Sequence, residues 1–205
     1  MKLHMTPTSP FARKVRVQLR ETGLEGDVTE VDHTAAKLSP TAPVAALNAE
    51  NPLGKIPALE VRGLPALFDS RVIARYLDTR HQGARLQPPE GAERFRDDRL
   101  EALADGIVDA VVLCRYELVL RPESARWQPW LEAQLDKAKR GVAALAATPL
   151  GDEPTLGTIA AAAALGYLDF RWADHDLWRG AHPGLVGWFT RFAERASMVA
   201  TKPPS

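Results

Sequence analysis

The chain has 205 residues, enough for one large domain or two small ones, and its 26 Lys plus Arg are balanced by 26 Asp plus Glu. It therefore lacks the basic excess that nucleic-acid binders usually carry, and its apolar fraction of 45% argues against disorder. No apolar run approaches the roughly 20 residues that span a bilayer. Because Cys114 is the only cysteine, no internal disulfide and no CxxC redox or zinc motif can form. We expect a globular cytoplasmic protein that holds no metal and binds neither nucleic acid nor membrane.

Residues 1–80 have the pattern of a small α/β domain. Strands are expected at "KLHM" (2–5) and "GDVTEVDH" (26–33), joined by a helix that starts after Pro10 and stops at Gly23. A strand, a helix and a strand in this order favour a parallel pair. Two short apolar runs, "IPALEVRG" and "LPALFD", then indicate a β-hairpin. A final helix over "SRVIARYLDTR" is expected to turn four side chains inward: Val72, Ile73, Tyr76 and Leu77.

The rest of the chain is predicted to be helical after a linker at residues 81–91, "HQGARLQPPEG", which is rich in Gly and Pro. We therefore divide the chain into an α/β domain (1–80), this linker, and an all-helical domain (92–205). Thr155 precedes "LGTIAAAAALGYLDFRW", which is apolar nearly all round and is expected to be the central buried helix. Apolar stripes indicate three further helices. Their members are Leu100, Leu103, Ile107, Val111, Cys114 and Leu118, then Leu131, Leu135, Ala138, Val142 and Leu145, then Leu185, Phe189 and Phe192.

The stretch "TSPFARKVRV" places a hydroxyl at the start of a helix whose first turns carry Arg13 and Lys14. Ser9 suits an N-cap and Pro10 the first helical position, so the pair can be simply a helix start. Alternatively, Ser9 and the free helical N–H groups bind an anion, and a thiolate held there would have a lowered pKa. On the first interpretation the two cations are solvated surface charges; on the second they add to the field of the site.

Two later stretches have a structural and a functional interpretation as well. In "NPLGKIPALE", Pro57 marks the entry to a strand, and a cis Ile56–Pro57 bond would present the Ile56 backbone to a peptide-like ligand. In "LFDSRVIARYL", Asp69 and Ser70 can simply cap the following helix. They also suit a zwitterion, with Asp69 facing an ammonium group and Ser70 a carboxylate.

Together, "SPFARKVRV", "NPLGKIPAL" and "DSRVIARYL" resemble the thioredoxin-like domain of cytosolic glutathione transferases, and "PTLGTIAAAAALGYLDFR" resembles the buried helix of their second domain. The likeness runs over nearly the whole chain and is greatest to the bacterial serine-type proteins of uncertain substrate. It implies an α/β plus all-α fold, with a thioredoxin-like domain (β-α-β-α-β-β-α) followed by a helical bundle. It also implies a homodimer.

The resemblance assigns roles to individual residues. Ser9 would hydrogen-bond the thiolate of glutathione, Lys55 would reach the glycyl carboxylate, and the Ile56 backbone would pair with the cysteinyl part. The remaining members of the implied glutathione site are Phe11, Pro57, Asp69 and Ser70. No metal is implied. The activity implied is that of a glutathione transferase acting in detoxification, in which the bound thiolate attacks a small apolar electrophile.

Several alternatives stay open. Thr8 is a competing hydroxyl beside Ser9, and His33 or Lys37 could contact glutathione from the loop after the second strand. A glutathione-dependent reductase or dehalogenase would use the same first site, and a non-catalytic binding or interaction module would keep the same fold.

The second substrate and the partner subunit are also assigned candidate residues. A pocket between the domains is expected to include Ile107, Val111 and Trp172. The dimer could pair Arg71 and Arg75 with Asp97 and Asp98 across a two-fold axis. The family usually has an aspartate at the position of Thr158, so the start of that helix is expected to be weaker here.

Overall fold

The computed structural model describes residues 1–36 and 44–204. The chain forms two compact units, one made of residues 1–88 together with 195–205, the other of residues 89–194. The divide falls between Pro88 and Pro89, inside the stretch that the sequence marks as a linker. The chain therefore returns to its first unit for its last residues.

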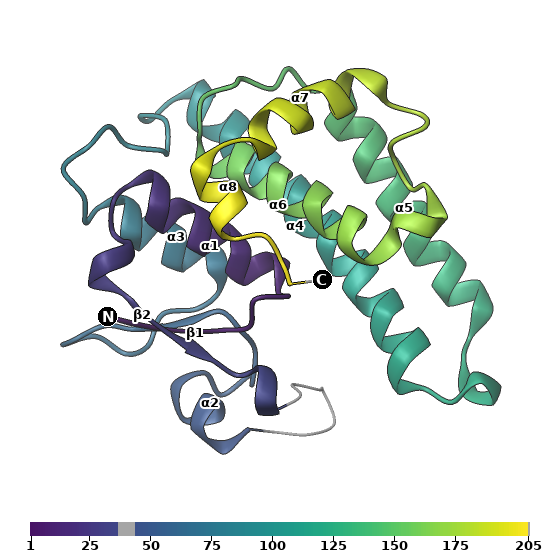
Figure 1. Cartoon of the computed structure of the whole chain (residues 1–205), viewed down its shortest axis with the longest axis horizontal. Coiled ribbons are helices and arrows are strands. Elements are labelled where there is room, and N and C mark those ends of the chain that lie inside the picture. Colours follow the sequence, from purple (N-terminus) through teal and green to yellow (C-terminus); the bar gives the residue numbers. More distant parts are fainter. Residues whose placement is uncertain (37–43, 205) are drawn as a thin grey trace. The chain divides into compact units, whose positions relative to one another are not determined.

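The first unit is built on a three-stranded sheet in the order β2-β1-β3. Strand β1 (Lys2–Met5) pairs in parallel with β2 (Thr29–Asp32) and antiparallel with β3 (Ala58–Glu60). The remaining elements of this unit are α1 (Pro10–Glu21), short 3-10 turns at Glu25–Asp27 and Thr34–Ala36, α2 (Ala45–Glu50), α3 (Ser70–Asp78) and α8 (Ala196–Ala200). Figure 1 shows α1 and α3 on one side of the strands and α2 on the other.

The second arm of the predicted hairpin is reduced to a single bridge, in which Leu59 and Leu67 exchange two backbone hydrogen bonds of 2.9 Å. In an antiparallel ladder the next such pairs would be Val61 with Pro65 and Pro57 with Asp69. Proline has no N–H to donate, so each of these pairs lacks one of its two bonds. The two prolines therefore limit the hairpin to one bridge.

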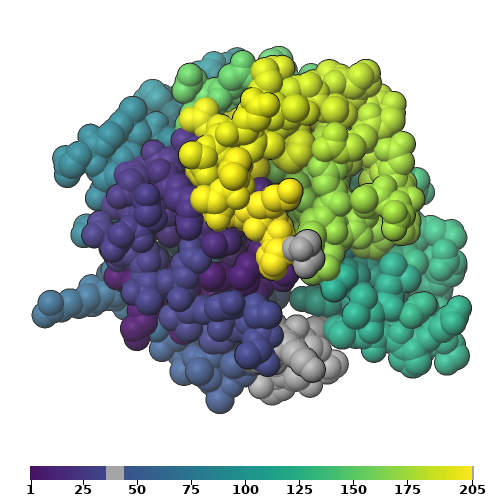
Figure 2. Space-filling view, viewed as in Figure 1, coloured from purple at the N-terminus to yellow at the C-terminus, as the bar shows by residue number. Residues whose placement is uncertain are grey.

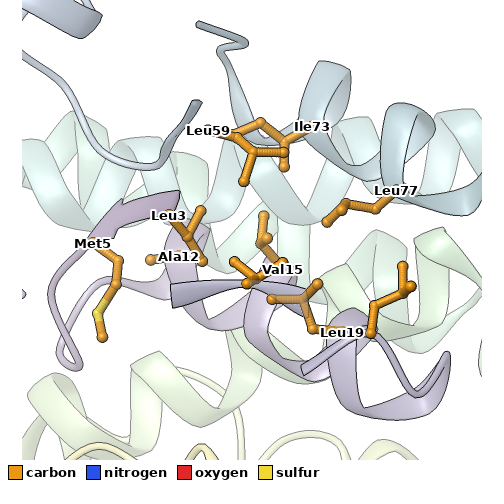
Figure 3. Close-up of a cluster of buried hydrophobic side chains, with 10 residues drawn as sticks. Leu3, Met5, Ala12, Val15, Leu19, Leu59, Ile73 and Leu77 are labelled. Atoms are coloured by element: carbon orange, nitrogen blue, oxygen red, sulfur yellow. The ribbon is translucent and has the colours of Figure 1, made fainter. Parts of the chain in front are cut away.

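The core of the first unit lies between the sheet and the helices α1 and α3. Figure 3 labels eight of its side chains, Leu3, Met5, Ala12, Val15, Leu19, Leu59, Ile73 and Leu77, and the cluster also includes Leu24 and Val28. The prediction that Val72 faces inward is wrong, because its side chain is 46% exposed while that of Ala74 is buried. Ser70, Ile73, Ala74 and Leu77 share one face at the i, i+3, i+4, i+7 spacing, and Val72 lies off that face.

Hydrogen bonds connect the C-terminal segment to α1. Arg195 donates two hydrogen bonds of 2.9 and 3.0 Å to the Glu21 carboxylate, which also accepts one from the Ser197 hydroxyl. Arg13 Nη2 donates to the Met198 carbonyl at 3.1 Å. In Figure 2 the yellow C-terminal residues lie against the purple N-terminal ones. Helix α1, which Ser9 caps, is thus bound to the end of the chain.

The second unit is entirely helical among the residues that the structure describes. Its elements are α4 (Ala92–Leu120), a 3-10 turn at Glu123–Ala125, α5 (Gln128–Ala146), α6 (Leu156–Trp172), a 3-10 turn at Ala173–His175 and α7 (Pro183–Ala193). Helix α6 packs on α4, and it is buried on every side along most of its length, as the sequence predicts. None of the helices in residues 1–36 and 44–204 is long and apolar enough to cross a membrane.

The start of α6 is firmly capped, which corrects the expectation that Thr158 weakens it. Thr155 caps the helix and forms a complete capping box with Thr158, whose hydroxyl accepts from the Thr155 N–H at 2.7 Å. Negative charge is supplied from α4, since both oxygens of Asp97 accept from the Gly157 N–H at 3.1 Å. Asp97 is only 7% exposed, so its expected role as a surface charge in a dimer interface is also wrong.

Candidate glutathione site

The register of the sheet brings the three candidate stretches to one end of the first unit. His4, near the end of β1, pairs with Ala58 at the start of the antiparallel β3, so the chain leading to Ser9 runs beside Pro57. Leu67 pairs with Leu59, which carries the following residues toward the same end and places Asp69 level with Pro57. Two helix N-termini and the entry of a strand therefore lie together at this end.

Ser9 is half-buried and acts as the N-cap of α1. Its backbone is extended, and its hydroxyl oxygen accepts from the Ala12 N–H at 3.2 Å. The hydroxyl proton makes no hydrogen bond within residues 1–36 and 44–204. Ser9 can therefore cap the helix and still donate to an anion. Its competitor Thr8 is also half-buried, and its hydroxyl lies 3.4 Å from that of Thr6.

The cations that follow Ser9 are not solvated surface charges. Arg13 and Lys14 are 6% and 2% exposed, and Arg13 is committed to the C-terminal segment. Arg16 donates to the Glu30 carboxylate at 2.9 Å. No acidic residue lies in the first turn of α1, so the helix N-terminus keeps its positive potential.

The Ile56–Pro57 peptide bond is cis, as the functional interpretation of this stretch requires. Pro57 is buried, Ile56 is half-buried, and Lys55 is exposed. The Ile56 N–H has no hydrogen-bond acceptor in the part of the chain that the structure describes. Sequence reasoning missed Asn51, which lies buried behind this loop.

Asp69 and Ser70 lie at the start of α3 as predicted. Asp69 is the N-cap, and its Oδ1 accepts from the Arg71 N–H at 3.0 Å while its side chain stays exposed. Ser70 is buried at the first helical position. Phe11, the remaining candidate for the glutathione site, is half-buried in the first turn of α1.

A chain of polar contacts that was not foreseen from the sequence links the buried His33 and His4 to the half-buried Glu60. His4 Nε2 contacts Glu60 at 2.8 Å, and His4 Nδ1 contacts His33 Nε2 at 2.8 Å with the two rings stacked. Burial, and then the nearby His4, lowers the pKa of His33. His33, a candidate ligand contact, is thus engaged with His4, and the other candidate, Lys37, lies outside the described residues.

The three residues expected in the second-substrate pocket are all buried in the helical unit. Ile107 and Val111 lie in its core on α4. Trp172, at the end of α6, lines a cavity of about 320 Å³ whose other lining residues all lie between Leu168 and Arg179. No group of three or more His, Cys, Asp or Glu side chains suited to a metal ion occurs among the described residues.

This fold is that of a known class of proteins. Models of the glutathione S-transferase N-terminal and C-terminal domains match residues 8–80 and 128–191. The chain is 33% identical over 210 residues to the uncharacterized GST-like protein YibF of Escherichia coli (strain K12), covering 100% of this chain and 99% of that one. It therefore belongs to the glutathione S-transferase family.

Solved structures give the same result. A glutathione transferase family member from Pseudomonas fluorescens Pf-5, with bound glutathione, is 47% identical with a TM-score of 0.95, over 100% of this chain and 99% of that one. A glutathione S-transferase from Methylobacillus flagellatus KT with glutathione bound is 36% identical with a TM-score of 0.88, over 99% of each chain. The thioredoxin-like and helical domains predicted from the sequence are thereby confirmed.

Proposed function

We propose that this protein is a serine-type glutathione transferase in which Ser9 activates the glutathione thiol for attack on a small apolar electrophile. The observation that carries the proposal concerns the Ser9 hydroxyl. Its oxygen caps α1, while its proton makes no hydrogen bond among the described residues and can be donated to a ligand. For this function we expect a cytoplasmic homodimer.

A thiolate beside Ser9 would accept the hydroxyl proton and feel the positive end of α1. A hydrogen bond to a charged group contributes about 1.5–3 kcal/mol, which corresponds to roughly one to two units of thiol pKa. The fraction of glutathione present as the nucleophile at neutral pH rises accordingly. The sulfur then forms a bond to the electrophilic carbon, and either a leaving group departs with its electron pair or an adjacent double bond takes up a proton.

The rest of the glutathione molecule would lie along the same end of the sheet. We assign the cysteinyl backbone to Ile56, the glycyl carboxylate to Lys55, and the γ-glutamyl group to Asp69 and Ser70. The glutathione bound in two relatives, and the S-(propanoic acid)-glutathione bound in a structure from Pseudomonas fluorescens Pf-5 that is 46% identical to this chain, support glutathione as the ligand.

The test is an ultraviolet titration of the glutathione thiolate bound to the wild type, to Ser9→Ala and to Thr8→Val. We expect a thiol pKa roughly one to two units below that of free glutathione, lost in Ser9→Ala and kept in Thr8→Val. A shift that disappears only in Thr8→Val would move the activating role to Thr8. Glutathione bound with an unshifted thiol would make the protein a binding module, and no binding at all would refute the proposal.

A further inference from the structure

The loop between α2 and β3 is organised by one buried side chain, Asn51, which is 2% exposed. Its backbone N–H donates to the Leu47 carbonyl of α2 at 2.8 Å, and its carbonyl accepts from the Gly54 N–H at 2.8 Å. Its side-chain Oδ1 accepts from the Leu53 N–H at 3.0 Å, and Nδ2 donates to the Lys55 carbonyl at 2.8 Å. All four kinds of polar group in this residue therefore act within one short loop.

The bond to Lys55 fixes a peptide plane that matters for the site. The Lys55 carbonyl and the Ile56 N–H belong to the same trans peptide unit, which is planar, so the two groups point in opposite directions. Because Asn51 holds the carbonyl toward the buried side of the loop, the Ile56 N–H is directed away from Asn51. That N–H has no acceptor among residues 1–36 and 44–204, so this orientation leaves it available.

The same loop has little room to relax. Gly54 adopts a φ of 62°, a left-handed conformation that side chains other than glycine disfavour. A Cβ added there would come within 2.9 Å of Asn48 Oδ1. Asn48 is a second asparagine near the loop, but its buried Oδ1 has no hydrogen-bond partner among the described residues. The two asparagines therefore differ in whether they bond to the loop, although they lie close together.

We propose that Asn51 is a positioning residue for glutathione, acting through the Lys55–Ile56 peptide plane that it holds in place. This inference rests on the proposed function, since Ile56 is there assigned to the cysteinyl backbone. Asn51 itself does not touch glutathione. Without its Nδ2–H donor the plane can rotate, and glutathione must reorder it on binding, which weakens affinity.

The experiment compares glutathione binding by isothermal titration in Asn51→Ala, Asn51→Asp and the control Asn48→Ala, with thermal unfolding recorded for each. Asn51→Asp is the decisive variant, because it keeps an acceptor for the Leu53 N–H but replaces the donor to the Lys55 carbonyl with an oxygen. We expect the dissociation constant to rise about tenfold in both Asn51 variants, the loss associated with one hydrogen bond of about 1.4 kcal/mol, and to stay unchanged in Asn48→Ala.

A second measurement does not depend on glutathione. The amide resonance of Ile56 in the ligand-free protein is expected to be single in the wild type and in Asn48→Ala, and shifted or broadened in Asn51→Asp. Wild-type affinity in Asn51→Asp with an unchanged Ile56 resonance would overturn the positioning role, as would equal weakening in Asn48→Ala. If the wild type binds no glutathione, the proposed function fails, and the Ile56 resonance still decides whether Asn51 orients the peptide plane.

Discussion

The start of α6 relies on a carboxylate from α4, and replacing Asp97 tests what that carboxylate supplies. Both of its oxygens lie 3.1 Å from the Gly157 nitrogen, and Oδ1 also accepts from the Thr155 hydroxyl at 2.5 Å. Asp97→Ala removes both oxygens and leaves the buried Gly157 N–H without this acceptor. Asp97→Asn removes the charge and keeps one oxygen acceptor, while the other oxygen becomes an NH2 donor.

The two substitutions should differ in size. A buried donor left unsatisfied costs about 1–3 kcal/mol, and an acid near a helix N-terminus contributes about 0.3–1 kcal/mol more. We therefore expect Asp97→Ala to lose about 2–3 kcal/mol, a fall in Tm of roughly 4–12 °C for a chain of this size. Asp97→Asn should lose about 1 kcal/mol or less, because burial opposes the charged form.

The contribution of Asp97 protonation to folding stability is expected to decrease as pH rises. Burial raises the pKa of Asp97 above 3.8, although the bonds from Thr155 and Gly157 act in the opposite direction. Because the folded pKa lies above the unfolded one, the stability linked to this proton is fully present below 3.8 and is lost as pH rises through the folded value. The gap between the wild type and Asp97→Asn should therefore narrow as pH rises above about 4.

Thermal unfolding followed by circular dichroism measures these differences, with Asp136→Asn, an exposed aspartate on α5, as the matched control. Asp136→Asn should leave Tm unchanged. Equal losses in Asp97→Asn and Asp97→Ala would refute the argument, because the charge and not the acceptor geometry would then hold the helix start.

Two further predictions concern buried groups. Because the pKa of His33 is lowered on folding, its contribution to stability is present above pH 6.5 and is lost as pH falls through the folded pKa. The charged and titratable groups around it are His4, Asp32, Lys2 and Glu60. The Tm of His33→Gln should therefore fall less than that of the wild type as pH drops below about 6.5, and parallel pH profiles would contradict this. Burial raises the pKa of Cys114 to about 11, so a thiol reagent near neutral pH should label it only after unfolding. Rapid labelling of the folded protein would show that its helix opens.

The sequence by itself determined the fold class and the order of the elements. Helix α1 starts at Pro10 behind Ser9, and α3 starts at Ser70 behind Asp69, because caps and apolar spacing are local features that neighbouring residues encode. The burial of α6 could also be predicted from the sequence, because a helix that is apolar on all sides has no polar face to expose to solvent. The family resemblance likewise rested on short local motifs.

What only the tertiary structure decided involves residues far apart in the chain. The Asp97 carboxylate caps a helix that begins at Leu156, Arg195 bonds to Glu21, and His4 of β1 contacts Glu60 of β3 and His33, which follows β2. No periodicity or spacing specifies such partners, because side-chain bonds between distant segments depend on how the elements pack. Asn51 is an intermediate case. Its bonds span only residues 47–55, yet its effect on the Ile56 N–H follows from a backbone geometry that the motif "NPLGKIPAL" does not express.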